Sequence, residues 1–262
     1  MKAPTRGYDL EEKPVALDVR GVSKTFRSEA GKNVTALQNV NLIVQQGDFV
    51  TLVGATGCGK TTLLNLIAGL DTPDTGCVNL SDGLRFGDNI AYVFQHYTLF
   101  PWRTALGNVA FALQMCGMPR RQRKRKADEL LRKVGLAGFE NAYPHELSGG
   151  MRQRAAIAQA LAMQPKLLLM DEPFGAVDDS TRSELQQMLT NLWQENHTTI
   201  LFVTHNIDEA IVLGSKVLVF TERPGRIVRE FNIDLPRPRN RMTQEFTDLF
   251  VQIRQSLSEQ LD

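Results

Sequence analysis

VTLVGATGCGKTTLLNLIAGL, residues 50–70, places an apolar strand, a glycine-rich loop and an apolar helix in direct succession. Within it, GATGCGKT at 54–61 completes the pattern G-x-x-x-x-G-K-[ST]. Glycine lets backbone N–H groups turn inward toward phosphate oxygens, and the dipole of the following helix favours negative charge at its N-terminus. We therefore expect a nucleotide-phosphate cradle made of Gly54, Ala55, Thr56, Gly57, Cys58, Gly59, Lys60, Thr61 and Thr62.

Three residues of the cradle have their own chemistry. Lys60 should reach the β- and γ-phosphates of a nucleotide, and the hydroxyl of Thr61 should hold Mg²⁺. Cys58 lies close to Lys60 and to the helix N-terminus, and such surroundings favour a thiolate. The alternative, which we prefer, is that Cys58 is simply a small residue that fits the loop.

A pair of carboxylates follows a second apolar strand. Residues 166–173 read KLLLMDEP, which describes a buried strand that ends in Asp171 and Glu172. In α/β sheets ligands gather at the carboxyl ends of the strands, so this pair should lie beside the cradle. We expect Asp171 to bind Mg²⁺, directly or through water, and Glu172 to be the general base that polarises an attacking water.

Composition bounds the class of protein. The chain has 262 residues, of which 42% are hydrophobic, and a formal net charge of +1. The length suits one α/β domain with a small subdomain. Because the net charge is close to zero, the chain has no overall positive potential that would attract nucleic acid, so we expect no nucleic-acid partner. Three cysteines without ligand spacing indicate a reduced, intracellular protein. Because no apolar run approaches the ~20 residues of a membrane span, we expect that any role in a membrane process is carried out from the cytoplasmic surface through partners.

The remaining pattern divides the chain into three parts. Residues 1–14 are expected to be a flexible leader, and residues 15–235 the main domain, with short strands up to about 94 and a helical subdomain at about 96–165. Further on, KLLLMD, TTILFVTH and KVLVF alternate with helices, which indicates a parallel sheet covered on both faces. Residues 236–262 should contain one amphipathic helix that packs on its own domain, with apolar positions Phe246, Leu249, Phe250, Ile253, Leu257 and Leu261.

A second helix N-terminus offers another phosphate contact. LSGGMRQR at 147–154 places Ser148, Gly149 and Gly150 at the start of a helix, where backbone N–H groups are unpaired. Since one chain has one cradle, this second group of donors most simply serves the nucleotide of a partner chain. The pattern therefore predicts a dimer with nucleotides between the subunits.

LSGGMRQR resembles the signature motif of the ABC ATPases, and the other motifs of that family follow in order. Gln95, at the end of NIAYVFQ, matches the Q-loop, and His205, at the end of TTILFVTH, matches the switch histidine. GAVD at 175–178 matches the D-loop, with Val177 in place of the usual leucine. Phe26, in VSKTF, falls where an aromatic residue stacks on adenine. The resemblance covers the chain from about 15 to 233.

The resemblance implies a role for each matched residue. Ser148, Gly149, Gly150 and Gln153 would clamp the γ-phosphate of ATP bound to the other chain. Gln95 would contact Mg²⁺, with Thr61 and Asp171, and also the attacking water. His205 would hold the γ-phosphate and Glu172 in register, and Asp178 would link the two sites across the dimer. The implied cofactors are ATP and Mg²⁺.

The same resemblance implies a P-loop NTPase core with an antiparallel β subdomain and an inserted helical subdomain, an α/β fold. Its partners would be a second ATPase subunit, identical or a paralogue, two transmembrane permease subunits and, indirectly, a solute-binding protein. An exporter or lipid-moving complex remains the alternative to an importer, and a soluble ABC protein is a third class. The third class usually has a coiled-coil insertion or two nucleotide domains, which this chain lacks.

Several short segments look like the nitrate, sulfonate and taurine branch of importer ATPases: LFPWRT, GATGCGKTT, FGAVD, NIDEA and ERPGRI. This suggests a small oxyanion-type solute. In this family the region after Gln95 lies beside the groove for a permease helix, so Leu99, Phe100 and Trp102 could dock the permease or could be core residues. The basic run RRQRKRK at 120–126 is interpreted as a solvated helix surface, with contact to lipid headgroups as the alternative.

Overall fold

The computed structural model describes residues 13–27, 31–81, 83–96, 98–175 and 177–258. Most of the expected leader, residues 1–12, and Leu261 of the tail therefore lie outside the described residues. Within the described part, no helix is long and apolar enough to cross a membrane.

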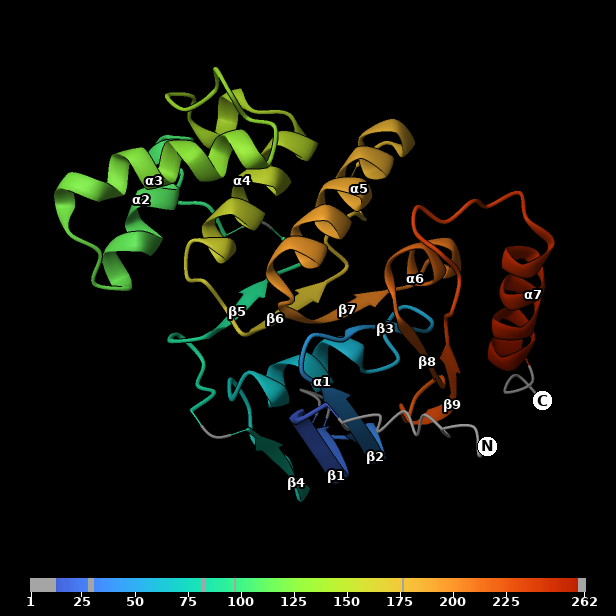
Figure 1. Ribbon diagram of the computed structural model, residues 1–262. Coiled ribbons are helices and arrows are strands. Elements are labelled where there is room, and N and C mark those ends of the chain that lie inside the picture. Colours follow the sequence, from blue (N-terminus) through green and yellow to red (C-terminus); the bar gives the residue numbers. More distant parts are fainter. Residues whose placement is uncertain (1–12, 28–30, 82, 97, 176, 259–262) are drawn as a thin grey trace, which may run out of the picture.

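The centre of the molecule is a six-stranded sheet of order β5-β6-β7-β3-β8-β9 (Figure 1). Neighbouring strands are parallel except β9, which runs antiparallel to β8. The strands are β3 (Phe49–Val53), β5 (Ile90–Val93), β6 (Leu167–Asp171), β7 (Thr199–Thr204), β8 (Lys216–Phe220) and β9 (Ile227–Asn232). Nearly every residue of the parallel strands is buried, because both faces of the sheet are covered. The predicted parallel sheet is confirmed.

Alternate residues of β5 and β6 pack into two separate cores on the two faces of the sheet. In β6, Leu168 and Met170 pack with the helices α2 to α5, whereas Leu167 and Leu169 pack with α1 and the smaller sheet. This follows from the two-residue period of a strand. The helices are α1 (Lys60–Ile67), α2 (Ala105–Met115), α3 (Arg120–Lys133), α4 (Gly149–Leu161), α5 (Asp179–Asn196), α6 (Ile207–Leu213) and α7 (Gln244–Ser258).

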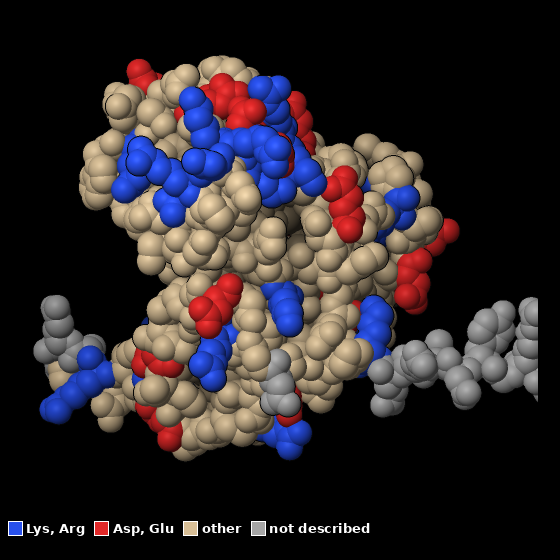
Figure 2. Space-filling view, turned by 60° about the vertical axis from the view of Figure 1, so that its left-hand side comes forward, with Lys and Arg blue, Asp and Glu red and all other residues tan. Residues whose placement is uncertain are grey.

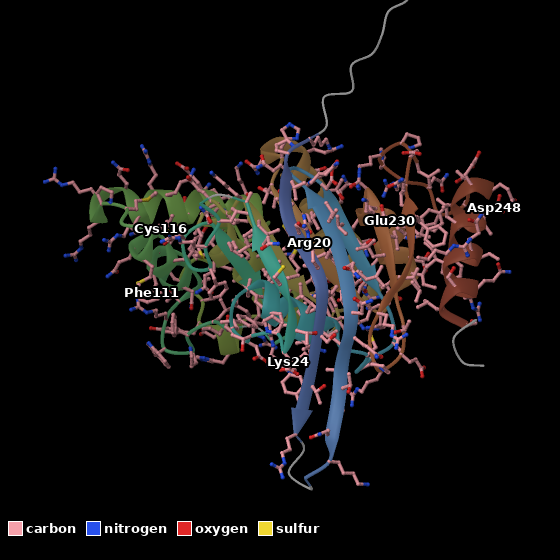
Figure 3. All side chains as sticks on the ribbon, turned by 90° about the horizontal axis from the view of Figure 1, so that it is seen from below. Arg20, Lys24, Phe111, Cys116, Glu230 and Asp248 are labelled. Carbon is pink, nitrogen blue, oxygen red and sulfur yellow. The ribbon has the colours of Figure 1, made fainter. Side chains whose placement is uncertain are left out.

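The smaller sheet is antiparallel, with order β2-β1-β4, and lies over α1. Its strands are β1 (Val15–Arg27), β2 (Asn33–Gln45) and β4 (Thr75–Leu80). Seen from below, the helical part with Phe111 and Cys116 lies on one side of the sheets, and α7 with Asp248 lies on the other (Figure 3). The expected fold, a P-loop core with an antiparallel β subdomain and an inserted helical subdomain, is confirmed.

One buried amide organises the loop that leads into the helical part. Asn108 of α2 is fully buried; its Oδ1 accepts the N–H of Phe100 at 2.7 Å. Its Nδ2 donates to the carbonyls of Phe100, Arg103 and Thr104 at 3.0–3.3 Å. Because the amide is fully buried and its bonds are at least partly buried, losing it would leave several backbone groups unpaired. The loop 100–104 is therefore held in one shape.

Two arginines fasten the segment that leads to α7. Arg237 and Arg239 donate hydrogen bonds to the carbonyls at the C-terminal end of α6, which have no partners inside the helix. Burial lowers the pKa of Arg237 to about 10 and that of Arg239 to about 9. Helix α7 then buries Phe246 and Ile253 against α6 and β8, so the tail packs on its own chain.

The basic run lies on α3, where Figure 2 shows Lys and Arg gathered over the helical part. Arg125 and Lys126 lie near Glu129 at 3.6 and 3.3 Å, and Arg132 lies 3.0 Å from Asp128. Ion pairs between exposed residues of one helix turn contribute only about 0.3–0.5 kcal/mol each. The run is thus a charged, solvated helix surface.

Candidate active site

The candidate site lies at the carboxyl ends of β3, β6 and β7, where the cradle loop and the two carboxylates come together. In the cradle, Lys60 is 4% exposed, and its Nζ donates to the carbonyls of Gly54 at 2.8 Å and Ala55 at 2.7 Å. The same Nζ lies 3.7 Å from Oε1 of Glu172. The ammonium group thus stands between the loop and the end of β6, where a phosphate group would meet both.

Gly59 shows why the loop needs glycine. Its φ is +113°, and a Cβ built there would lie 2.6 Å from the carbonyl oxygen of Ala36. Both the backbone conformation and the close approach to β2 exclude a side chain. The glycine thereby allows the loop to close tightly before α1 begins at Lys60.

Asp171 ends β6 and is 3% exposed. Burial raises the pKa of its carboxyl, while a hydrogen bond with Thr61 opposes that shift. Its Oδ1 is buried and has no hydrogen-bond partner among the described residues. An unpaired carboxylate oxygen beside a threonine hydroxyl suits Mg²⁺, which protein sites often hold by one or two side chains together with water and phosphate. Thr61 and Asp171 therefore fit the expected metal.

Glu172 has an unusual backbone conformation. Its φ is +41°, its N–H donates to the carbonyl of Val203 at 2.9 Å, and its Oε2 lies 2.9 Å from Nδ1 of His205. A left-handed conformation is uncommon for residues other than glycine, and it is typical of functional sites. The turn brings the carboxylate next to both His205 and Lys60. This position suits the predicted role of Glu172 as a general base.

Two further predicted residues lie at the exposed rim. Gln95 is exposed two residues beyond the end of β5. Phe26, at the end of β1, is 42% exposed, and Nζ of Lys24 lies 5.3 Å from its ring centre. An exposed ring suits stacking on a flat base. Both residues remain predictions for nucleotide and metal contact.

The signature residues open α4, in the helical part of the fold. Ser148 caps the helix, and its Oγ accepts the N–H of Met151 at 3.2 Å. A Cβ at Gly150 would lie 2.5 Å from Cγ2 of Thr181, so glycine lets α4 approach α5. Gln153 is buried, and its Nε2 has no hydrogen-bond partner within the described ranges.

The structure does not bring these signature residues to the cradle. Among the residues that the structure describes, no hydrogen bond joins residues 148–150 to residues 54–62. Asp178 likewise serves its own helix: it caps α5 by accepting from the N–H of Thr181 at 3.0 Å and the hydroxyl of Ser180 at 2.6 Å. These bonds hold the pKa of Asp178 well below its usual range. One chain therefore presents the cradle and the signature as two separate surfaces.

Sequence reasoning missed Arg223, which lies in the turn between β8 and β9. Its Nε and its terminal guanidinium nitrogen donate to the carbonyl of Gly57 at 3.2 and 2.7 Å. Arg223 belongs to the ERPGRI segment, which in the sequence indicates only the resemblance to the nitrate, sulfonate and taurine importers and not a contact with the cradle. A Cβ at Gly225 would lie 2.4 Å from the carbonyl oxygen of Cys58, so a glycine is needed for this turn to pack on the cradle.

The structure decides between the open alternatives for Cys58 and Leu99. Cys58 is 2% exposed, and burial raises the pKa of its thiol although Lys60 Nζ lies 3.7 Å away. It is therefore a packed thiol, and the preferred interpretation, a small residue that fits, agrees with the structure. Leu99 is 8% exposed and belongs to the core of the helical part, so it is not a surface for a partner.

The other two candidates for docking are closer to the surface. Trp102 is 70% exposed, and its ring centre lies 5.4 Å from that of the half-buried Phe100. Phe100 also meets Phe111 of α2 edge-on, with ring centres 5.0 Å apart. An exposed tryptophan held against a partly buried aromatic pair can be covered by a partner.

Comparisons with known proteins agree with this geometry. Residues 37–175 match the family model described as ABC transporter. The chain is 47% identical to the nitrate import ATP-binding protein NrtD of Synechocystis sp., over 86% of this chain and 86% of that protein. It is 46% identical to the taurine import ATP-binding protein TauB of Rhizobium johnstonii, over 84% and 85% of the two chains.

A solved structure matches as well. A dimeric, post-hydrolysis structure of the ATP-binding cassette MJ0796 bound to ADP and Pi aligns with a TM-score of 0.75 at 35% identity, covering 83% of this chain and 98% of that one. The chain belongs to the ABC transporter family, as one of its ATP-hydrolysing cassettes.

Proposed function

We propose that the chain binds ATP in the cradle of residues 54–62 and hydrolyses it with Glu172 as the general base. The observation that carries this is the convergence of Lys60 and His205 on the two oxygens of the Glu172 carboxylate, at 3.7 and 2.9 Å. Lys60 would leave the loop carbonyls to bind the β- and γ-phosphates. Glu172 would take a proton from the attacking water, and His205 would hold that carboxylate in place.

Mg²⁺ would be held by Thr61, Asp171 and Gln95, and it would neutralise charge on the phosphate oxygens. The adenine would stack on Phe26. Among these residues, the unpaired buried Oδ1 of Asp171 gives the most direct support for a metal.

We further propose that two chains form a head-to-tail dimer around two ATP molecules. Among the described residues no hydrogen bond joins Ser148, Gly149 or Gly150 to the cradle of the same chain, so the N-terminus of α4 would bind the γ-phosphate on the partner chain. Gln153 and Asp178 would support this interface. The second subunit is either a copy of this chain or a paralogue.

The membrane partner would be a pair of permease subunits. A groove of about 330 Å³ lies between the sheet and the helical part; its lining includes Phe94, Phe111, Met115 and Met163. Met115 is 69% exposed, and flexible methionines and aromatics suit a short apolar helix of a partner. Phe94 precedes Gln95, so the groove is directly joined to the predicted metal contact. With Phe100 and Trp102, this groove would be the permease dock.

The complex would import a small oxyanion-type solute, such as nitrate, a sulfonate or taurine, that a binding protein delivers. The named relatives, one for nitrate and one for taurine, support this class of solute. In that setting the chain would sit at the cytoplasmic face of the inner membrane as a peripheral subunit.

Growth tests this proposal. A strain deleted for the gene should fail to grow when one of nitrate, taurine or an alkanesulfonate is the limiting nitrogen or sulfur source. The wild-type gene should restore growth and the Glu172→Gln variant should not. Normal growth of the deletion strain on all three solutes would contradict the import role, while the ATPase activity of the purified chain is measured separately.

A further inference from the structure

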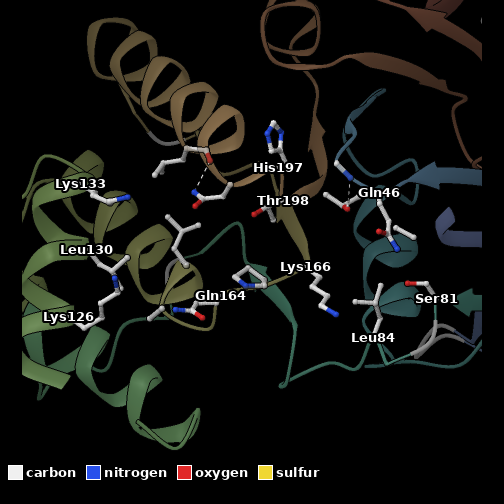
Figure 4. A pocket seen from close by; sticks show the side chains of 18 of the residues that line it. Gln46, Ser81, Leu84, Lys126, Leu130, Lys133, Gln164, Lys166, His197 and Thr198 are labelled. Carbon is white, nitrogen blue, oxygen red and sulfur yellow. Dashed lines mark hydrogen bonds between the residues drawn. The ribbon is translucent and has the colours of Figure 1, made fainter. Parts of the chain in front are cut away.

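A second cavity, of about 610 Å³, lies at the opposite end of the central sheet from the candidate active site. It is bounded by the residues that precede β3, β6 and β7: Gly47, Lys166 and Thr198 (Figure 4). The residues that directly follow these strands, Gly54, Glu172 and His205 respectively, belong to the candidate active site. The cavity and the active site are therefore opposite ends of the same three strands.

Two helices repeat this arrangement. Helix α4 begins after Ser148 of the signature, and its last residue, Leu161, lines the cavity. Helix α5 begins after Asp178, and its last residue, Asn196, lines the cavity as well. The five elements β3, β6, β7, α4 and α5 thus each have a predicted nucleotide-site residue at one end and the cavity at the other.

The charge on the cavity wall is mainly positive. Lys126 and Lys133 face it from α3, and Lys166 faces it from the start of β6 (Figure 4). Glu129 is the only carboxylate in the described lining, and it is 3.3 Å from Lys126. Lys133 is 3.4 Å from Glu195, outside the lining. Three lysines and one glutamate leave a net positive wall that would attract an anion.

Leucine side chains give the wall an apolar part beside these charges and several uncharged polar groups. Leu84 comes from the loop after β4, Leu130 from α3, Leu161 from α4 and Leu192 from α5. Sites for small molecules are commonly 300–1,000 Å³ in volume and combine an apolar lining with a few polar groups. This composition fits a ligand with an apolar body and an acidic group.

Two wall residues have a strained backbone. Gln164 and His197 both have a φ of +49°, and they are two of the four residues other than glycine with positive φ in the described part of the chain. His197 is the C-terminal cap of α5, where glycine is usually favoured. Glycine at either position would relieve strain but would remove a polar side chain from the wall.

We propose that this cavity binds an amphiphilic organic anion and that its occupancy changes the rate of ATP hydrolysis. The acidic group would be held by Lys126, Lys133 and Lys166, which come from α3 and from the start of β6. A ligand that spans these elements would favour one placement of the helical part relative to the sheet. Because α4 carries the signature, such a preference would alter dimer closure. The regulatory half of this proposal rests on the proposed ATPase function.

Binding can be measured with anilinonaphthalene sulfonate, an aryl sulfonate whose fluorescence rises in apolar surroundings. The test variant is Lys126→Gln, Lys133→Gln, Lys166→Gln in one chain. The matched control is Arg120→Gln, Arg121→Gln, Lys124→Gln, which removes the same charge from α3 outside the cavity. We expect the test variant to bind the probe about tenfold or more weakly, since three charged contacts are lost, and the control to match wild type. Equal affinity in both variants would overturn the proposal.

The apolar docking groove is the competing site for this probe, and Met115→Glu tests it. If Met115→Glu binds the probe as wild type does, the result supports the cavity as the binding site. If Met115→Glu loses probe binding and the lysine variant keeps it, the probe binds in the docking groove and the proposal is overturned. Trp193 gives a local readout, because its Nε1 donates to the carbonyl of Gly47 in the cavity wall at 3.0 Å. In a Trp102→Phe background, bound probe should quench Trp193, and this quenching should be lost with the three lysines.

The regulatory half is tested by ATPase assays with and without the probe. Without the probe, the lysine variant should hydrolyse ATP at the wild-type rate, since none of its three changes touches the candidate active site. With the probe, the rate should change in wild type and in the Arg120, Arg121, Lys124 control, and not in the lysine variant. Probe binding without any effect on the rate would overturn the regulatory half. A wild-type chain without ATPase activity would instead contradict the proposed function, and the binding result would stand apart from it.

Discussion

Arg223 donates two hydrogen bonds to the carbonyl of Gly57, at 3.2 and 2.7 Å, across 166 positions of sequence. The peptide group is planar and trans, so the N–H of Cys58 points away from the carbonyl that Arg223 holds. The turn between β8 and β9 therefore fixes the orientation of a backbone donor in the phosphate cradle.

Arg223→Ala should consequently raise the KM for ATP by about tenfold, the equivalent of one hydrogen bond with a charged partner, with a smaller change in kcat. Arg223→Lys keeps the charge but not the two-pronged donor, so its KM should be intermediate. Arg226→Ala is the control, since Arg226 lies in the same turn but donates to Gln38. A KM raised equally in all three variants would show that only the turn as a whole matters.

Glu172→Gln should keep ATP binding and slow hydrolysis by about 10²–10⁴-fold, the range expected for loss of a general base. The amide can still contact His205 but accepts no proton from water. The variant should also accumulate as an ATP-bound dimer, which size-exclusion chromatography with ATP would show. Turnover near that of wild type would remove Glu172 as the base.

Composite sites can be tested by mixing two inactive variants. Ser148→Arg should spare the cradle of its own chain and block the partner's site, and Lys60→Ala should do the reverse. A mixture should recover one working site, formed by the cradle of the first and the signature of the second. If the mixture stays inactive where wild-type chains of the same concentration hydrolyse ATP, the head-to-tail dimer is contradicted.

Trp102 and Leu99 should separate docking from core packing. Trp102→Ala should cost less than about 1 kcal/mol of unfolding free energy, because the ring is 70% exposed. Leu99→Ala, in the core, should cost about 2–5 kcal/mol. Chemical denaturation measures the unfolding free energy of each variant. When only folded protein is used, Trp102→Ala should fail to co-purify with the permease, whereas Leu99→Ala should still co-purify. Normal assembly of Trp102→Ala would remove this residue from the dock.

Cys58 should resist alkylation. Maleimides react with the thiolate, and burial raises the pKa of Cys58, so its thiolate forms only at higher pH than usual. At neutral pH, peptide mass spectrometry should find the exposed Cys77 modified well before Cys58, and the rate at Cys58 should rise as pH is raised. Modification of Cys58 as fast as Cys77 would contradict the buried position.

How much could be read from sequence depends on whether the property is local. The cradle at 54–61, the strand that ends in Asp171 and the helix cap at Ser148 depend on backbone conformations that a few neighbouring residues impose, so short patterns predict them. The alternation of apolar strands with helices likewise predicts the parallel sheet, because burial on both faces requires continuous apolar strands.

Tertiary structure decided what depends on distant segments. The sequence of residues 99–102 does not indicate which of these apolar side chains is buried in the core. Their burial depends on how α2 packs and on the loop conformation that Asn108 fixes. The contact of Arg223 with Gly57 and the gathering of Lys126, Lys133 and Lys166 at one cavity bring together residues from different elements. A local sequence pattern does not predict these contacts, because the backbone hydrogen bonds within a segment form in the same way whichever segments lie beside it. Only the packing of the helices and strands determines which side chains share a site.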